Sequence, residues 1–276
     1  MSEVKQVPLS GVPETSLIPL YLKAMESQRP DALIKDEKAV ELVSRMSYDF
    51  AQIRKIPLSE ANKVTRILLS CEMDRYVRNF LRQHPEAVVV HIGCGLDSHF
   101  ERVDNGLVEW YDLDMPDIIE LRCKLIGDER ERYHLLGCSV FDNAWVEAVR
   151  KHSLRPVLFL AEAVFVYFEG MQVKSLVLRL REHFPGAELV FDAWSPFHVW
   201  WSNLQISPSK FGGLLHWGIW RGQEIEGWSD DIRLLGEWGF FDRPEPRLAH
   251  IRWAHHIEAL FRTMRIYHFQ LGKATG

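Results

Sequence analysis

The sequence predicts an α/β fold in which helices flank both faces of a doubly wound, mostly parallel sheet. Two observations predict it. Residues 1–85 show only helical periodicity, and from residue 86 onward short β-branched runs alternate with helical segments. Such alternation is typical of βαβ units, whose parallel strands are buried on both faces. Ligands of these folds bind beyond the carboxyl ends of the strands, so the residues that end strands are the candidates for a binding site.

The N-terminal part is expected to form a helical cover over residues 1–85. A first helix spans 14–27, with Leu17, Leu20 and Ala24 at helical spacing. Asp36 is the expected N-cap of a second helix that runs through Phe50. Ser59 is the expected N-cap of a third, long helix that ends near His84, and its apolar stripe contains Val64, Ile67, Leu68, Cys71 and Val77.

The remainder, residues 86–276, is expected to form the sheet domain. Asp114 is the expected N-cap of a helix over 115–126, and Pro116 lies in its first turn. Residues 195–230 interrupt the alternation with an insert rich in Trp, His and Gly. The other expected helices span 144–151, 170–183 and 248–264, and the seven expected strands span 87–93, 107–114, 132–138, 156–162, 187–194, 232–241 and 265–272.

Composition and charge exclude several function classes. The 276 residues are 47% hydrophobic and 26% charged, which is a globular balance, and their net charge is −5. Because no basic stripe occurs, we expect no nucleic-acid partner. We expect neither a signal peptide nor a membrane span, because no apolar run is long enough. The cysteines, which show no paired spacing, predict no metal site and a cytoplasmic protein with reduced thiols: Cys71, Cys94, Cys123 and Cys138.

The first strand ends in a glycine turn that favours ligand binding. Gly93 and Gly95 allow a tight turn and a close approach of a ligand to the backbone, and Asp97 follows them. The third glycine of the dinucleotide fingerprint is replaced by Ser98. This favours a ligand with one nucleoside and no diphosphate, a description that S-adenosylmethionine fits. A turn without a ligand is the alternative.

Acidic residues end two further strands. Asp112 and Asp114 follow Gly95 at the place where an acidic side chain can accept hydrogen bonds from ribose hydroxyls. One of them suffices for this role, and the other is then structural. Glu162 ends the fourth strand, where a buried carboxylate is costly without a partner. It is expected to face the crevice and to bind the ligand, or else to form a structural salt bridge.

These stretches resemble the leucine carboxyl methyltransferase family, most closely its bacterial branch of polyketide-type (tetracenomycin-type) O-methyltransferases. The motifs are GCGLD at 93–97, DLDMP at 112–116 and AEAVFVYF at 161–168, within a resemblance that covers residues 12–272. It implies a Rossmann-like, seven-stranded class I methyltransferase that uses S-adenosylmethionine. By resemblance, Gly93, Asp114 and Glu162 bind this cofactor, and Ser139 and Val140 flank its adenine.

The chain departs from the family at two arginine positions. Leu69 stands where the family carries an arginine for the cofactor carboxylate, and His99 replaces an arginine in the turn after the first strand. Arg66, one helical turn before Leu69, is the candidate substitute. The alternative function is accordingly a non-catalytic relative that binds a cofactor or a partner. A nicotinamide-dependent oxidoreductase is a third hypothesis, against which Ser98 and the absence of a Tyr-x-x-x-Lys pair argue.

The acceptor is expected to be a small molecule that is methylated on a carboxyl or hydroxyl oxygen. Aromatic walls suit a flat, polyketide-like acceptor, although the same tryptophans can serve only to pack the insert. The sequence neither demands nor excludes a homodimer. The candidates for a catalytic role are Tyr167, His198 and His216, and the further candidates for the acceptor pocket are Tyr21, Trp200, Trp201 and Trp217.

Overall fold

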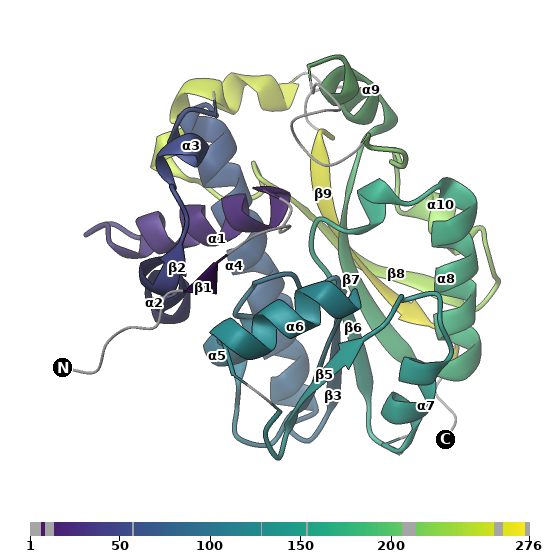
Figure 1. Cartoon of the computed structure of the whole chain (residues 1–276). Coiled ribbons are helices and arrows are strands. Elements are labelled where there is room, and N and C mark those ends of the chain that lie inside the picture. The colour runs from purple at the N-terminus through teal and green to yellow at the C-terminus, as the bar shows by residue number, and fades with distance from the viewer. Residues whose placement is uncertain are drawn as a thin grey trace.

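The computed structural model describes residues 7–8, 14–56, 58–127, 129–152, 154–205, 214–256 and 262–273. A seven-stranded sheet in the order β5-β4-β3-β6-β7-β9-β8 forms the centre of the molecule (Figure 1). The strand pairs from β5 to β7 are parallel, whereas β9 is antiparallel to both of its neighbours. The predicted doubly wound α/β fold with a mostly parallel seven-stranded sheet is confirmed.

The strands agree with the prediction to within two residues at each end. Their bounds are β3 Val88–Ile92, β4 Glu109–Asp114, β5 Tyr133–Gly137, β6 Val157–Ala161, β7 Ala187–Trp194, β8 Ile232–Gly239 and β9 Met264–Leu271. A separate parallel pair consists of β1 Val7–Pro8 and β2 Met46–Ser47.

The helices cover both faces of the sheet and the carboxyl ends of its parallel strands. They are α1 Glu14–Ser27, α2 Glu37–Arg45, α3 Ala51–Arg54, α4 Glu60–Gln83, α5 His99–Val103, α6 Pro116–Leu125, α7 Ala144–Arg150, α8 Gly170–His183, α9 Pro196–Gln205 and α10 Gln223–Glu226. Two 3₁₀ helices are η1 Phe165–Tyr167 and η2 Pro246–His256. No helix in the described part of the chain is long and apolar enough to cross a membrane.

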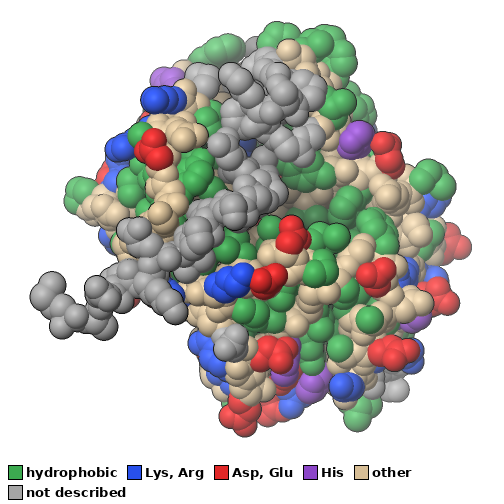
Figure 2. All heavy atoms as spheres, viewed as in Figure 1, with side chains coloured by type: hydrophobic (Ala, Val, Ile, Leu, Met, Phe, Trp, Pro, Cys, Tyr) green, Lys and Arg blue, Asp and Glu red, His purple; other side chains and the backbone are tan. Residues whose placement is uncertain are grey.

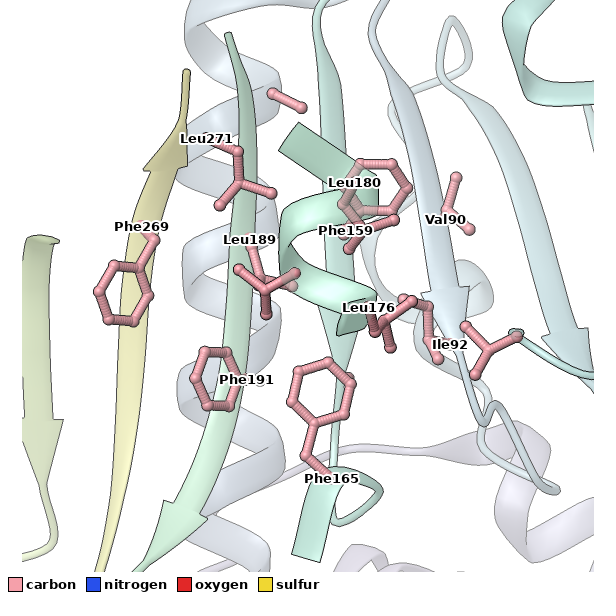
Figure 3. Close-up of a cluster of buried hydrophobic side chains, with 14 of the residues drawn as sticks. Val90, Ile92, Phe159, Phe165, Leu176, Leu180, Leu189, Phe191, Phe269 and Leu271 are labelled. Carbon is pink, nitrogen blue, oxygen red and sulfur yellow. The ribbon is translucent and has the colours of Figure 1, made fainter. Parts of the chain in front are cut away.

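The core consists of two apolar layers, one on each face of the sheet. Alternate residues of a strand point to opposite faces, so Val90 and Phe159 join one layer while Val89 and Leu158 join the other. In Figure 3, side chains from β3, β6, β7 and β9 gather around Leu176 and Leu180 of α8. The opposite layer packs against α4. Burial on both faces explains the nearly continuous apolar runs of β3 and β6.

Two predicted helix caps are confirmed. The Asp36 side chain accepts the Ala39 N–H at 2.8 Å, and the Ser59 hydroxyl accepts the Asn62 N–H at 3.1 Å. Both bonds satisfy backbone donors that the first turn of a helix leaves free. Asp36 therefore begins α2 and Ser59 begins α4, as the sequence predicts.

Three details of the predicted helices are wrong. The second helix ends at Arg45 rather than Phe50, because Met46 and Ser47 pair with β1. The N-cap of α6 is Met115, and Asp114 instead accepts the Met115 N–H from one position earlier. The expected C-terminal helix is the 3₁₀ helix η2 as far as His256. The part of that prediction over 257–261 lies outside the described residues.

The N-terminal helices pack near the carboxyl ends of the parallel strands. α1 packs against α2 and α4 (Figure 1), and its apolar side chains share a buried cluster with Leu121 and Leu125 of α6. α4 also contributes Val77 and Phe80 to the core layer on the sheet. The division into a cover of residues 1–85 and a sheet domain of residues 86–276 remains a prediction.

Candidate functional site

A cavity of about 300 Å³ lies where β3, β4 and β6 end, beneath α1 and α4. This is the edge at which ligands of doubly wound sheets bind, and the volume is at the lower end of that of ligand pockets. In the view of Figure 2, apolar side chains gather in the middle and upper right of the surface, whereas charged side chains gather toward its lower edge. The predicted site residues that line the cavity are Gly93, Gly95, Asp97, Asp114, Glu162 and Tyr167.

The glycine turn after β3 forms the floor of the cavity. Gly93 and Gly95 have φ values of +65° and +50°, in the left-handed region that other residues rarely adopt. The Gly93 N–H donates to the Leu113 carbonyl at 2.7 Å. A Cβ atom on Gly93 would lie 2.4 Å from Cγ2 of Val164, whereas one on Gly95 would meet no atom within 4 Å. Gly93 is therefore required by close packing, and Gly95 leaves open space for a ligand.

We expect Gly93→Ala to destabilise the fold more than Gly95→Ala. Both substitutions carry the strain of a left-handed residue, about 1–2 kcal/mol. Gly93→Ala adds a clash with Val164, and overpacking typically costs about 1–3 kcal/mol more. Urea unfolding of the two variants measures the difference. Equal free energies of unfolding would contradict the close contact between the two turns.

Asp114 faces the cavity from the end of β4. Its two carboxylate oxygens accept the N–H groups of Gly95 at 2.8 Å and Met115 at 2.7 Å. Burial raises the pKa of this carboxyl, and the two hydrogen bonds oppose that rise. Each oxygen keeps a second lone pair. Asp114 can therefore accept hydrogen bonds from a ligand.

Asp112 does not line the cavity, and its contacts support the structural role expected of one of the two aspartates. The side chain is 1% exposed, and its carboxylate pairs with the Arg122 guanidinium. It also accepts hydrogen bonds from the Tyr133 hydroxyl at 2.6 Å and from Trp110 Nε1 at 2.8 Å. His91 Nδ1 lies 3.2 Å away. Asp112 lies within the strand rather than at its end, where neighbouring elements saturate its hydrogen bonds.

Glu162 enters the cavity directly after β6. The Ser70 hydroxyl donates to Oε1 at 2.6 Å, His99 Nε2 lies 3.0 Å from Oε2, and the Lys23 ammonium lies 3.7 Å from Oε1. Burial raises the pKa of Glu162, but the Lys23 charge and the bonds from His99 and Ser70 hold that pKa well below its usual range. Glu162 is therefore an ionised carboxylate in the cavity wall.

A network of buried charged side chains contacts the wall residues Asp97 and Glu162. His99 is fully buried, and its Nδ1 lies 2.6 Å from Oδ1 of Asp74. Arg102 joins Asp36, Asp74 and Asp97 through its guanidinium. His99 thus has both ring nitrogens beside carboxylates, and through Glu162 it contacts the wall of the cavity.

Lys23 is a site residue that the sequence reasoning missed. It lies on α1, is 2% exposed, and its ammonium contacts Asp97. A lysine on a helix is ordinarily read as solvent-facing. The sequence feature that indicates burial of Lys23 is its spacing. Lys23 follows Leu20 by three residues and so shares the buried face of the helix. Ser70 and Asp74, four residues apart on the buried face of α4, carry the same signal.

Arg66 lines the cavity from α4. Within the part of the chain that the structure describes, it forms neither an ion pair nor a hydrogen bond. Burial lowers the pKa of its guanidinium, although Tyr167, Asp192 and Glu162 oppose that effect. Leu69 is 4% exposed and packs in the apolar layer against the sheet. The geometry therefore supports Arg66, and not position 69, as a source of positive charge for a ligand.

The structure does not bring the other candidates into the cavity. Tyr21 stacks on Phe50 with a centroid distance of 5.2 Å. Trp217 is 7% exposed and packs against Gly170 in the core, as the alternative interpretation of these tryptophans expects. His216 pairs with Glu169 at 3.0 Å. Ser139 and Val140, expected beside adenine, follow β5 and do not line the cavity either.

The α9 candidates lie near the surface. Trp200 and Trp201 are 55% and 48% exposed. His198 packs edge-on against Trp194 with a centroid distance of 4.7 Å. Burial lowers the pKa of His198, and the Arg66 charge lowers it further. Residues 206–213 of the expected insert lie outside the described residues.

Asp97, His99 and Glu162 place three potential metal ligands within 4.8 Å of one another. The Lys23 ammonium contacts Asp97 and lies near Glu162, and Arg102 pairs with Asp97. These cations already balance the carboxylates, so we assign no metal to this trio.

Comparisons with known proteins decide the family. The leucine carboxyl methyltransferase family matches residues 16–180. This chain belongs to that family. The methyltransferase is 34% identical over 239 residues to "Tetracenomycin polyketide synthesis O-methyltransferase TcmP" of Streptomyces glaucescens, and the match covers 86% of both chains. It is 30% identical over 204 residues to "S-adenosyl-L-methionine-dependent methyltransferase dpfgK" of Gibberella zeae, with 68% of both chains covered.

Solved structures confirm the fold of the methyltransferase. A putative methyltransferase from Thermobifida fusca superposes with a TM-score of 0.60 at 15% identity, covering 95% of this chain and 96% of the other. A DUF574 protein from Streptomyces avermitilis gives 0.57 at 16% identity, covering 91% and 96%. With the family match, the expected enzyme class and cofactor are confirmed: the chain is an S-adenosylmethionine-dependent methyltransferase.

Proposed function

We propose that this methyltransferase transfers the methyl group of S-adenosylmethionine to a carboxyl or hydroxyl oxygen of a small, aromatic or polyketide-like acceptor. The observation that carries the proposal is the cavity at the carboxyl ends of β3, β4 and β6, where Gly95, Asp114 and Glu162 come together. The printed name of the Streptomyces glaucescens relative, an O-methyltransferase of polyketide synthesis, supports the choice of acceptor.

The residues of the cavity fit the cofactor group by group. Asp114 has free lone pairs for the ribose hydroxyls. The glycine turn leaves room for the adenosyl group beside the backbone. The ionised Glu162 suits the ammonium, and Arg66, which has no partner among the described residues, suits the carboxylate. We retain Ser139 and Val140 as the residues beside adenine, since they follow the neighbouring strand β5.

The chain contributes mainly positioning to the reaction. S-adenosylmethionine supplies an electrophilic methyl group on its sulfonium sulfur. Glu162 and Arg66 would hold the amino acid portion of the cofactor, and this would limit its movement in the cavity. Val164 packs against the glycine turn, and α1 covers the cavity, which limits the access of water. Tyr167, which lines the cavity and is 42% exposed, is the described side chain best placed to contact an acceptor.

Acceptor chemistry decides whether a base is needed. A carboxylate attacks without losing a proton, whereas a hydroxyl benefits from a general base. Tyr167 is only partly buried, but the loss of solvent around its hydroxyl raises its pKa, so the hydroxyl stays protonated and can donate a hydrogen bond. His198 is neutral near pH 7 because burial lowers its pKa, and it remains the candidate base for a hydroxyl acceptor. His216, paired with Glu169, is a weaker candidate.

Transfer of a radiolabelled methyl group tests the proposed acceptor class. Purified protein, labelled S-adenosylmethionine and a panel of aromatic carboxylic acids and phenols should give labelled product. Alkali releases the label as methanol from an ester but not from an ether, so the same assay distinguishes the two acceptor oxygens. Binding of S-adenosylhomocysteine without transfer to any aromatic acid or phenol would show that the acceptor class is wrong.

The cellular compartment and the binding partners are proposed from the cysteines, the cavity and the net charge. We propose a cytoplasmic enzyme, since the cysteines lack the paired spacing of a disulfide framework. A small-molecule acceptor accounts for the cavity, and the net charge of −5 favours no nucleic-acid partner. A homodimer remains compatible with this function and is not required by it.

A further inference from the structure

The turn that follows β6 has a strained backbone. Ala163, between Glu162 and Val164, has a φ of 57° and is the one non-glycine with positive φ among the described residues. This left-handed conformation is disfavoured for a residue with a Cβ atom and persists only where surrounding structure holds it. All three residues of the turn line the cavity.

A buried carboxyl on the neighbouring strand holds this turn. Asp192 lies one residue beyond Phe191, which pairs with Ala161 across β6 and β7. Its Oδ1 accepts the backbone N–H of Ala163 at 2.5 Å. Its Oδ2 is buried and has no hydrogen-bond partner among the described residues. The side chain is 1% exposed and does not line the cavity. The hydrogen bond to Ala163 therefore compensates for the burial of this carboxyl.

The conformation of Ala163 sets two features of the cofactor cavity. It directs Glu162 toward Ser70 and His99, whose contacts keep the carboxylate in the wall. It also presses Val164 against the glycine turn, where not even a Cβ atom on Gly93 would fit. A different backbone conformation at Ala163 would displace both side chains.

We propose that Asp192 is a positioning residue for cofactor binding, which acts by holding Ala163 in its left-handed conformation and thereby aims Glu162 and Val164 into the cavity. This inference rests on the proposed role of Glu162 in binding the cofactor ammonium. Asp192 itself touches neither cofactor nor acceptor.

A purely electrostatic role is the alternative. Burial raises the pKa of Asp192 to about 7, so part of its population is charged at neutral pH. Arg66 is close enough to oppose that rise, yet the two side chains form no ion pair within 4.0 Å. Asparagine keeps an oxygen that can accept the Ala163 N–H but removes the charge. The variant Asp192→Asn therefore separates the two roles.

The test compares S-adenosylhomocysteine affinity by calorimetry in the wild type, D192N, D192A and the double variant D192A/A163G. D192A should bind about tenfold more weakly or worse, a loss of about 1.4 kcal/mol. D192N should stay within about twofold of the wild type, because the hydrogen bond survives. Glycine adopts the left-handed conformation without help, so D192A/A163G should recover several-fold of the lost affinity.

Glu188→Ala is the matched control on the same strand. Glu188 is a half-buried carboxylate bonded to His268 at 2.6 Å, at the opposite end of β7 from the cavity. Its loss should lower the melting temperature without changing the affinity. Weak binding by D192N, unchanged binding by D192A or no recovery in the double variant would each overturn the inference. Where D192A alone fails to fold, weak binding by D192N still overturns the inference, and near-wild-type binding by D192A/A163G still supports it. Absence of binding to the wild type would instead overturn the proposed cofactor role of Glu162.

Discussion

Replacing Glu162 by glutamine is expected to weaken S-adenosylhomocysteine binding by about 30-fold or more. Glutamine keeps the size of the side chain but removes its negative charge. The carboxylate is ionised and sits in a largely buried wall, beside Ser70, His99 and Lys23. Losing one partner of a buried, hydrogen-bonded charge pair typically costs about 2–5 kcal/mol.

The ligand 5′-methylthioadenosine makes this prediction specific. It contains the adenosine and the sulfur but no amino acid group, so its affinity for E162Q should match that for the wild type within about twofold. E188Q serves as the control protein, because Glu188 lies at the far end of β7 from the cavity. Calorimetry with both ligands measures the effect. Equal losses for the two ligands would indicate a disturbed fold, and no loss would place the ammonium elsewhere.

Asp112→Ala is expected to destabilise the fold by about 3–5 kcal/mol. Asp112 and Arg122 are each 1% exposed, and their ion pair ties β4 to α6. Removing the carboxylate leaves a buried guanidinium without its counter-charge and deprives the Tyr133 hydroxyl and Trp110 of an acceptor. Urea unfolding at neutral pH measures the loss.

The double variant D112A/R122M is the control for this pair. Replacing both charges by apolar groups removes the uncompensated cation, so the double variant should be more stable than D112A alone. Burial raises the pKa of Asp112, yet the Arg122 charge and the hydrogen bonds hold that pKa well below the ordinary range of an aspartate. The stabilisation is therefore complete above the pKa that Asp112 has in the unfolded chain, and it is lost as the pH falls through the lower pKa of the folded protein. If the wild type already lost stability above pH 5 and the double variant did not, the low pKa assigned to Asp112 would be contradicted.

The sheet was predictable because its physical signal is local. Strands buried on both faces require continuous β-branched and apolar runs, such as VVVHI in β3 and VLFLA in β6. The caps at Asp36 and Ser59 depend only on a polar side chain before a periodic stretch. By contrast, the end of α2 at Arg45 depends on pairing with β1, a contact between segments far apart in the sequence.

The sequence predicts the site residues that end strands. It does not predict which side chains face the cavity and which are enclosed, because that depends on how neighbouring elements pack. Asp112 and Asp114 point to the same face of β4 by spacing. Only the placement of Arg122 and Tyr133 shows that Asp112 is enclosed while Asp114 is open to the cavity. Lys23 appears polar and solvent-facing in the sequence, and only the fold places it against Asp97. Composition likewise could not separate the core tryptophan Trp217 from the exposed α9 pair.

The central claim is that the cavity at the carboxyl ends of β3, β4 and β6 is the S-adenosylmethionine site. Calorimetric titration of the wild type and of Asp114→Ala with S-adenosylmethionine, S-adenosylhomocysteine and NADH tests it most directly. We predict micromolar binding of both adenosyl ligands to the wild type, loss of that binding in Asp114→Ala, and no binding of NADH. Equal binding to the wild type and the variant, or binding of NADH alone, would contradict the claim.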